Sequence, residues 1–284
     1  MTLTLLEVYK KIFESLKSEQ IENPGLEANM IISHVLKISN EKIFMQKKKR
    51  IYKKTLNRIY NLKNKRTQGM PIAYIFKNAY FYSNKFFINN NVLIPRPESE
   101  LLVELGYKYI KDEKDQQILD LCCGSGCIGI SIYKKLQWKP EIVFSDISQE
   151  ALKVCKKNLM KFKIKRNSTI IQSDLFKKIN KKFNLILCNP PYVKYKDFLN
   201  LEKGIKNYEP KRALVSPKNG TSHIKKIIKD SKEKLYKNGV LIVEIGYDQS
   251  KEIENFFKKH GFDDIVVSKD LSGIKRTISA KWKK

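Results

Sequence analysis

The sequence lacks long hydrophobic runs, and this absence argues against a membrane protein. No apolar stretch in the 284 residues approaches the roughly 20 residues that a transmembrane helix needs. The first residues also lack the pattern of a signal peptide. Hydrophobic residues still make up 42% of the chain, which is enough for the cores of one full α/β domain and a smaller one. We therefore expect a cytoplasmic protein that does not bind membranes.

Cysteine and histidine are both scarce. The cysteines show no disulfide-framework spacing, and the three histidines are scattered along the chain. Cys122, Cys123 and Cys127 are close together in sequence, but no paired C-x-x-C unit accompanies them. Structural thiols are therefore favoured over metal ligands, and no metal site is expected. The five cysteines are Cys122, Cys123, Cys127, Cys155 and Cys188.

Acidic residues are few relative to basic ones. The chain has 29 acidic and 57 basic residues, and its formal net charge is +28. Such a charge often indicates nucleic-acid binding. The lysines, however, are spread along the chain among many Asn and Ile residues, as an AT-rich coding bias would produce. Basic residues are densely grouped only at 47–50, continued by Lys53 and Lys54. A solvated helix face explains this group as well as an RNA contact does. We expect no stable nucleic-acid binding, with steering toward an acidic partner surface as a secondary benefit.

The most informative motif that is present is Asn189-Pro190-Pro191-Tyr192. It follows the apolar run 183–188, which predicts a buried strand. Two prolines cannot continue a β-ladder, so the motif begins at the carboxyl end of the strand, where open α/β sheets bind ligands. The Asn189 side-chain oxygen and the Pro190 carbonyl are two acceptors suited to an NH2 group, and Tyr192 adds an aromatic face. The alternative is a turn that only ends a strand.

A second motif upstream predicts a cofactor loop on the same sheet. The predicted strand 117–122 runs into the segment 123–129, which opens a helix. Its glycines let the backbone turn tightly and approach a ligand. About twenty residues further on, a second predicted strand, 141–145, ends in Asp146, where an acidic side chain binds ribose hydroxyls. Ser148 is the expected N-cap of the next helix.

The same loop also fits a dinucleotide fingerprint, so a nicotinamide dehydrogenase is an alternative. Gly124, Gly126 and Gly129 match that pattern, which is weak evidence when it stands alone. Asp120 argues against a dinucleotide, because its carboxylate would lie beside a pyrophosphate of like charge. S-adenosylmethionine has no phosphate and carries an ammonium and a sulfonium. The acid therefore favours this cationic cofactor, although Asp120 could instead cap the strand without a ligand.

The tetrapeptide 189–192 resembles the catalytic motif of amino-methyltransferases, which transfer a methyl group from S-adenosylmethionine to an amide or exocyclic nitrogen. Nearly the whole chain is similar to the release factor protein-(glutamine-N5) methyltransferases, the PrmC/HemK family. The linker and the isoleucine-proline-arginine-proline signature of this family are matched upstream of the cofactor loop, and other segments of the family are matched downstream of it. The matching segments are 69–74, 86–89, 93–100, 208–210, 213–214, 239–246 with Gln249, and 270–276.

The resemblance implies a Rossmann-like α/β methyltransferase domain, S-adenosylmethionine as cofactor and class I peptide chain release factors as partners. In methyltransferases of this type the residues after the third strand, 168–173, flank the adenine, so Leu175 or Phe176 is the expected apolar wall unless both are core. A monomer is expected. The expected catalytic residues are Asn189, Pro190 and Tyr192, and Pro191 joins them in binding the substrate. The expected cofactor contacts are Asp120, Cys122, Cys123, Gly124, Ser125, Gly126, Asp146, Leu175 and Asn189.

Two departures from the family pattern stand out. Cys122 replaces the usual first glycine of the cofactor loop and is followed by Cys123. Because cysteine takes positive φ less freely than glycine, we expect ordinary β or α backbone at the first turn. The stretch 215–220 is also poorer in glycine than the family pattern. Neither departure touches Asn189, Asp146 or Gly124.

The chain divides into three predicted parts. Residues 1–70 form a helical domain expected to bind substrate, whose first helix begins at a capping box of Thr4 and Glu7. Residues 71–95 form a linker, in which aromatic alternation from Ile72 to Ile94 predicts a hairpin. Residues 96–284 form the catalytic domain.

The expected reaction methylates the glutamine amide of a Gly-Gly-Gln loop. Its nitrogen is a poor nucleophile, because the lone pair is delocalised. Acceptors at Asn189 and Pro190 would hold both N–H bonds and aim the lone pair at the sulfonium methyl, without a strong general base. A nucleic-acid amino-methyltransferase is the main alternative, but it needs base flipping and a target-recognition region. The other alternative is a binding module without activity.

Overall fold

The computed structural model describes residues 2–112 and 114–284, and contacts divide the chain into two compact units. The first unit comprises Met1–Lys77 and Lys203–Tyr208, and the second comprises Asn78–Glu202 and Glu209–Lys284. No helix in the described residues is both long enough and apolar enough to span a bilayer.

The first unit is mainly helical. Its first helix starts at the predicted capping box, where Thr4 Oγ1 accepts from the Glu7 amide at 3.3 Å and the Glu7 carboxylate accepts from the Thr4 amide at 2.7 Å. Leu5, Val8 and Ile12 follow at helical spacing and are buried in its core. The elements are β1 Leu3–Thr4, α1 Leu5–Ser18, α2 Pro24–Leu36, α3 Asn40–Met45, β2 Arg50–Ile51, α4 Lys53–Thr67, α5 Ile72–Phe76 and α10 Lys203–Tyr208.

The hairpin of the linker is shorter than the sequence predicted. Residues Ile72–Phe76 form helix α5, which begins after Pro71 and ends at Lys77, a residue with a left-handed backbone. Only the strands β3 Asn78–Phe81 and β4 Asn84–Phe87 pair as a hairpin. The expected alternation therefore failed over the first turn, where Tyr74 and Ile75 are both buried although they are consecutive in sequence.

The second unit is built on a seven-stranded sheet with the order β10-β11-β9-β8-β5-β6-β7. Strands β9, β8, β5, β6 and β7 are parallel, and β11 runs antiparallel to β9 and β10. This arrangement confirms the predicted Rossmann-like α/β domain. The strands are β5 Ile118–Leu121, β6 Ile142–Asp146, β7 Ser168–Gln172, β8 Phe183–Cys188, β9 Leu235–Glu244, β10 Asp263–Lys269 and β11 Lys275–Trp282.

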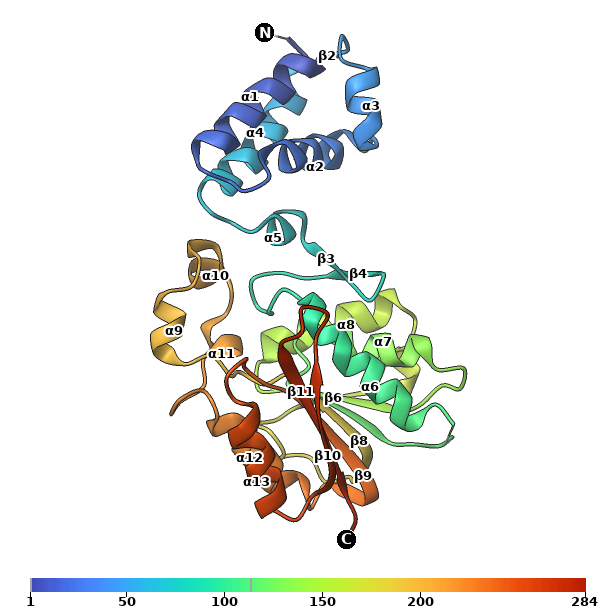
Figure 1. Cartoon of the computed structure of the whole chain (residues 1–284). Coiled ribbons are helices and arrows are strands. Elements are labelled where there is room, and N and C mark those ends of the chain that lie inside the picture. Colours follow the sequence, from blue (N-terminus) through green and yellow to red (C-terminus); the bar gives the residue numbers. More distant parts are fainter. Residues whose placement is uncertain (1, 113) are drawn as a thin grey trace. The chain divides into compact units, whose positions relative to one another are not determined.

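Helices cover both faces of this sheet (Figure 1). Helices α6, α7 and α8 pack on one face, and α12 and α13 pack on the other. The helices are α6 Glu100–Ile110, α7 Cys127–Lys135, α8 Gln149–Lys161, α9 Tyr195–Leu199, α11 Lys211–Leu214, α12 Ser222–Ser231 and α13 Ser250–Lys259, with 3-10 turns at Pro97–Ser99 and Lys165–Asn167.

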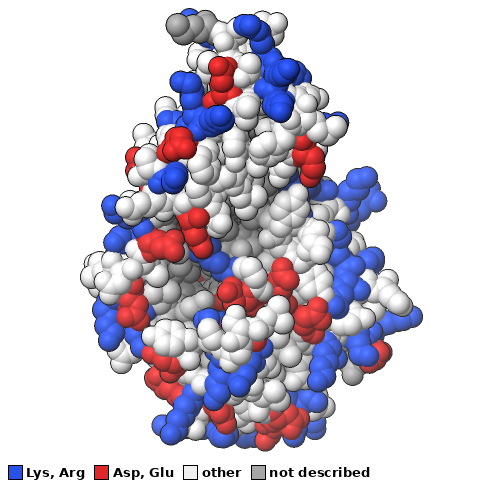
Figure 2. All heavy atoms as spheres, turned by 45° about the horizontal axis from the view of Figure 1, so that its top comes forward, with Lys and Arg blue, Asp and Glu red and all other residues white. Residues whose placement is uncertain are grey.

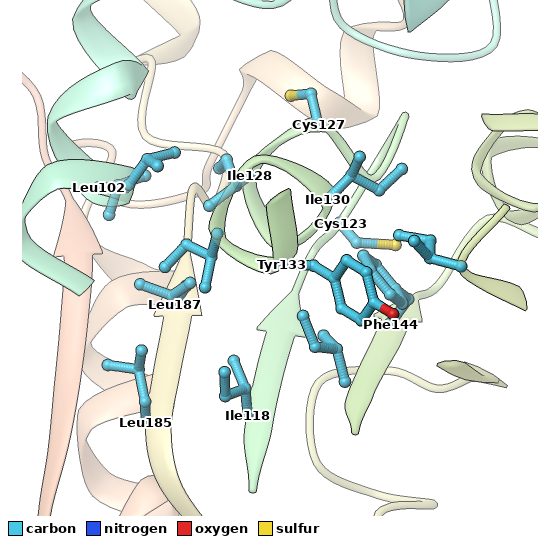
Figure 3. Packing of buried hydrophobic residues seen from close by; sticks show 14 of the residues in the cluster. Leu102, Ile118, Cys123, Cys127, Ile128, Ile130, Tyr133, Phe144, Leu185 and Leu187 are labelled. Atoms are coloured by element: carbon cyan, nitrogen blue, oxygen red, sulfur yellow. The ribbon is translucent and has the colours of Figure 1, made fainter. Parts of the chain in front are cut away.

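Side chains along each strand alternate between the two faces. In β8, Leu185 and Leu187 lie in the cluster under α6 and α7, whereas Ile186 and Cys188 lie in the cluster under α12 and α13. Figure 3 shows Leu187 beside residues of α6 and α7 in the first cluster. The parallel strands are thus buried on both faces, as their continuous apolar runs predict.

The chain order reverses around β5, and this reversal positions the site. From β5 the chain moves outward to β6 and β7, and it then returns to place β8 on the other side of β5. Open α/β sheets bind ligands at the carboxyl ends of the strands beside such a switch point. Leu121, Asp146 and Cys188 end β5, β6 and β8 there, so the cofactor loop and the 189–192 motif meet at one edge.

Candidate active site

A pocket of about 490 Å³ lies at this edge, entirely within the second unit. Its volume falls in the range of about 300–1000 Å³ that is usual for small-molecule sites. Most of the residues that the sequence assigned to the cofactor line it, together with part of the 189–192 motif. The predicted residues on its wall are Cys122, Cys123, Gly124, Ser125, Asp146, Leu175, Asn189 and Pro191.

Each of the other predicted residues is the direct sequence neighbour of a residue on this wall. Among the residues that the structure describes, Asp120, Gly126, Pro190 and Tyr192 do not line the pocket. Phe176, the alternative to Leu175 as an adenine wall, is also absent from the lining and packs in the core under α12 and α13.

The cofactor loop turns through left-handed backbone, and the expectation for Cys122 was wrong. Cys122 has φ of 59°, and Gly124 and Gly126 have φ of 52° and 77°. The Cys123 amide donates to the Ser145 carbonyl of β6 at 3.0 Å. This bond ties the loop to the neighbouring strand, so Cys122 adopts the glycine-like turn despite a cost of about 1–2 kcal/mol for a residue with a Cβ.

Gly129, the third glycine of the loop pattern, lets α7 pack closely on the sheet. A Cβ at this position would lie 2.6 Å from Phe144 Cε1 and 3.0 Å from Asp120 Oδ2. Its amide donates to Asp120 Oδ2 at 2.9 Å. The glycine is therefore needed for helix–sheet contact beneath the loop rather than at the pocket wall.

Asp120 is fully buried under α7. One carboxylate oxygen accepts from Gly129, and the other, Oδ1, has no hydrogen-bond partner among the described residues. Burial, with a smaller contribution from the nearby charge of Asp146, raises the pKa of Asp120 to about 8 against the hydrogen bond from the Gly129 amide, which lowers it. Direct contact between Asp120 and the cofactor stays a prediction.

Asp146 ends β6 on the pocket wall with its carboxylate held by the backbone. Oδ2 accepts from the Gly124 amide at 3.0 Å, and Oδ1 accepts from the Ser148 amide at 2.8 Å. Ser148 itself caps α8 as predicted, with its side chain accepting from Ala151 at 3.3 Å. Burial raises the pKa of Asp146, and these amides and the charge of Arg212 oppose the rise. Each carboxylate oxygen keeps a lone pair for a ligand hydroxyl.

Asn189 belongs to a partly buried hydrogen-bond chain that the sequence did not reveal. Asn189 Nδ2 donates to Ser99 Oγ at 3.0 Å, and Ser99 Oγ donates to Glu244 Oε2 at 2.6 Å. The Tyr192 hydroxyl donates to the second oxygen, Glu244 Oε1, at 3.0 Å. Glu244 is 1% exposed, and burial raises its pKa to about 7 against the effect of the Ser99 and Tyr192 hydrogen bonds.

The backbone after Asn189 is fixed as well. The Gln249 side chain donates through Nε2 to the Tyr192 carbonyl at 3.0 Å and accepts through Oε1 from the Gly246 amide at 2.9 Å. Gln249 therefore joins the 189–192 motif to the turn after β9. Gln249 and Gly246 matched the family pattern, but the resemblance assigned them no role.

A second contact that the sequence did not reveal is an ion pair beside the pocket. It joins two segments that match the family pattern. Arg96 Nη2 donates to Glu209 Oε1 at 2.5 Å, and the Ile94 amide donates to Glu209 Oε2 at 3.2 Å. The Glu209 side chain is almost wholly buried, and Arg96 and Arg212 both line the pocket. The ion pair thus holds the segment 93–100 against Glu209 within the second unit. Only the family resemblance singled out these segments in the sequence.

The cysteines of the site are free thiols. Burial raises the pKa of Cys127 to about 12 and raises the pKa of Cys123 and Cys188 well above the ordinary thiol value. They are therefore neutral thiols near pH 7. No group of three or more metal-ligating side chains occurs in residues 2–112 and 114–284.

Family comparisons cover both units. The family model described as "PrmC N-terminal domain" matches residues 7–76, and the model described as "Methyltransferase small domain" matches residues 98–204. A "Release factor glutamine methyltransferase" from Clostridium botulinum is 35% identical over 269 residues, which are 94% of this chain and 95% of that protein. A protein of the same name from Borreliella burgdorferi is 38% identical over 247 residues, which are 87% of this chain and 85% of that protein.

Solved structures share the fold at low sequence identity. The hMettl16 catalytic domain, in complex with MAT2A 3'UTR hairpin 6, superposes with a TM-score of 0.58 at 14% identity, covering 78% of this chain and 82% of that one. A methyltransferase from Pyrococcus furiosus superposes with a TM-score of 0.50 at 13% identity, and the match covers 70% of this chain and 89% of that one.

Proposed function

The chain belongs to the release factor glutamine methyltransferases, and we propose that it methylates the side-chain amide N5 of the glutamine in the Gly-Gly-Gln motif of class I peptide chain release factors. The methyl donor is S-adenosylmethionine. The observation that carries the proposal is the position of Asn189 on the wall of the pocket that Asp146 and the cofactor loop also line.

The residues of the pocket fit S-adenosylmethionine. Asp146 offers carboxylate lone pairs to the ribose hydroxyls, and the buried Leu175 offers an apolar wall to the adenine. The left-handed turns at Cys122 and Gly124 expose loop backbone toward the same pocket. When bound, the cofactor supplies a methyl group on a sulfonium; the N–C bond forms as the S–C bond breaks, and a nitrogen proton is released to solvent.

The protein's part in this reaction is to hold the amide. The Asn189 side-chain oxygen and the Pro190 carbonyl accept the two N–H bonds of the glutamine amide. This contact turns the nitrogen lone pair toward the methyl group and stabilises the positive charge that develops on nitrogen. Tyr192 provides the aromatic face beside the amide. Because alignment of the two reactants supplies much of the rate, no strong general base is needed.

The helical unit is proposed to bind the release factor, and the protein is proposed to act as a cytoplasmic monomer. On the face drawn in Figure 2, Lys and Arg side chains are scattered among Asp and Glu rather than gathered in one patch. This distribution supports coding bias as the source of the charge of +28. Stable nucleic-acid binding is therefore not part of the proposal.

The test is incubation of the protein with labelled S-adenosylmethionine and, in separate reactions, purified release factor, DNA or ribosomal RNA. We expect label in the release factor only, with mass spectrometry locating the methyl group on the Gly-Gly-Gln glutamine. A release factor with that glutamine changed to alanine is the matched control and should stay unlabelled. Label in DNA or RNA, or in the alanine control, would overturn the assignment.

A further inference from the structure

We propose that Ser99 and Glu244 are positioning residues that fix the orientation of the Asn189 amide, with Oδ1 turned toward the substrate. The inference rests on the proposed function, because it specifies how Asn189 comes to present an acceptor. An asparagine side chain has an oxygen and an NH2 group of nearly equal size. Hydrogen bonding rather than shape must therefore decide which end faces the pocket.

The sheet register brings the three side chains together. Cys188, the last residue of β8, pairs with Val243 of the adjacent parallel strand β9, so Asn189 and Glu244 each directly follow one member of this pair. Side chains along a strand alternate between the two faces, so Glu244 lies on the face opposite to Val243, which packs under α12 and α13, and its carboxylate accepts from Ser99 just before α6. Ser99 precedes the first residue of α6, and its hydroxyl lies between the Asn189 amide and the Glu244 carboxylate.

Counting protons fixes the direction of the chain. Ser99 has one hydroxyl proton, which it donates to Glu244 Oε2 at 2.6 Å. Its oxygen can then only accept from the group 3.0 Å away, so that group must be the Asn189 NH2. Turning the amide over would place Oδ1 against a Ser99 lone pair. The NH2 end therefore stays on Ser99, and Oδ1 is left for the pocket.

The charge of Glu244 is what makes this direction unique. An ionised carboxylate only accepts, and its two oxygens take the protons of Ser99 and Tyr192. A protonated Glu244 could donate to Ser99 instead, which would release the Ser99 proton toward Asn189. The amide could then turn over and present its NH2 group to the NH2 group of the glutamine, which would oppose binding in the reactive geometry.

Several groups around Glu244 set the pH at which this happens. Burial, with a smaller contribution from the charge of Glu98 just before α6, raises its pKa to about 7. The hydrogen bonds from Ser99 and Tyr192 and the charge of Arg276 on β11 oppose this rise, and Arg276 is itself paired with Asp270 at 3.3 Å. The ionised form, and with it the fixed amide, is therefore expected to be lost as the pH falls below about 7.

The first test is a double-mutant cycle in kcat with release factor as substrate. Ser99→Ala should lower kcat on the order of 10- to 100-fold in the wild-type background. In an Asn189→Ala background, Ser99→Ala should change kcat by less than about 2-fold, because its effect passes through Asn189. Ser279→Ala, which removes another buried hydroxyl that hydrogen-bonds Tyr109, is the matched control and should not change kcat.

The second test is the pH profile of kcat. Wild-type kcat should fall as the pH drops below about 7, and Glu244→Gln should have a lower kcat without that acid limb, because glutamine can donate as well as accept and does not titrate. S-adenosylmethionine affinity by calorimetry and the melting temperature show whether each variant is folded. Equal effects of Ser99→Ala in both backgrounds, or an acid limb that persists in a folded Glu244→Gln, would overturn the inference. Wild-type enzyme that fails to methylate release factor would instead contradict the proposed function.

Discussion

The two halves of the pocket are built in different ways. The cofactor half uses residues close together in sequence, and much of its shape comes from backbone: Asp146 is held by the amides of Gly124 and Ser148. The amide half uses side chains from distant segments, with Ser99, Asn189 and Glu244 joined in one chain. A backbone-built site tolerates side-chain change, as Cys122 shows by adopting the turn of a glycine. A side-chain network should tolerate little.

The largest expected effect separates the two halves. Asn189→Ala removes one acceptor for the amide, and its kcat should fall on the order of 10²–10³-fold, because the contact matters most in the transition state. Affinity for S-adenosylmethionine should change little. Asn184→Ala is the control, since Asn184 lies on β8, the strand that Asn189 directly follows, and its side chain accepts from the Gln117 amide instead. Steady-state kinetics on a release factor provide the measurement. Near-normal kcat in a folded Asn189→Ala would mean that the motif only ends a strand.

The converse change addresses the cofactor half. Asp146→Ala should weaken S-adenosylmethionine binding by roughly 1–3 kcal/mol, the usual cost of losing a charged hydrogen-bond partner. Asp112→Ala, which removes an exposed carboxylate paired with Lys111, should leave the affinity unchanged. Calorimetry should also show no binding of NAD. Unaltered affinity in Asp146→Ala, or tight NAD binding, would refute the cofactor assignment.

Asp120 provides a test of stability beneath the cofactor half. Its pKa of about 8 in the folded state lies above the ordinary aspartate value of 3.8, so the folded state binds the proton more tightly than the unfolded state. The resulting stability is complete below about pH 4 and is lost as the pH rises through 8. Asp120→Asn removes this titration. Urea unfolding between pH 5 and 9 should therefore show a smaller loss of stability with rising pH in the variant, by about 1–3 kcal/mol. Parallel curves would show that Asp120 is ionised in the folded protein.

The smallest expected effect concerns which substrate the amide half of the pocket receives, a release factor or a nucleic acid. If coding bias explains the basic surface, nucleic-acid affinity should be weak and abolished by modest salt, while methyl transfer to a release factor persists. Binding assays and methylation assays across a salt series would show the difference. Tight, salt-resistant binding to one RNA or DNA sequence would indicate instead that the amide half receives a base amine.

The strands of the site could be located from the sequence. The predicted strand 183–188 is β8 residue for residue, and the strands before the cofactor loop and Asp146 differ from β5 and β6 by no more than a residue or two at their ends. Continuous apolar runs that stop at Gly, Pro or Asp carry this information locally. The backbone of Cys122 was mispredicted, because intrinsic preference was outweighed by the bond from Cys123 to β6.

The sequence by itself determined which residues end the strands at the pocket, because periodicity and strand-breaking residues act over a few positions. Only the tertiary structure decided which side chains meet there. Ser99 and Asn189 are separated by 90 positions, and Ser99 and Glu244 by 145. Their contact depends on the register of β8 against β9 and on the packing of α6, which are set by burial of the apolar clusters on both faces of the sheet. No local pattern records that Glu244 is buried beside Asn189, so no local pattern could assign it a role.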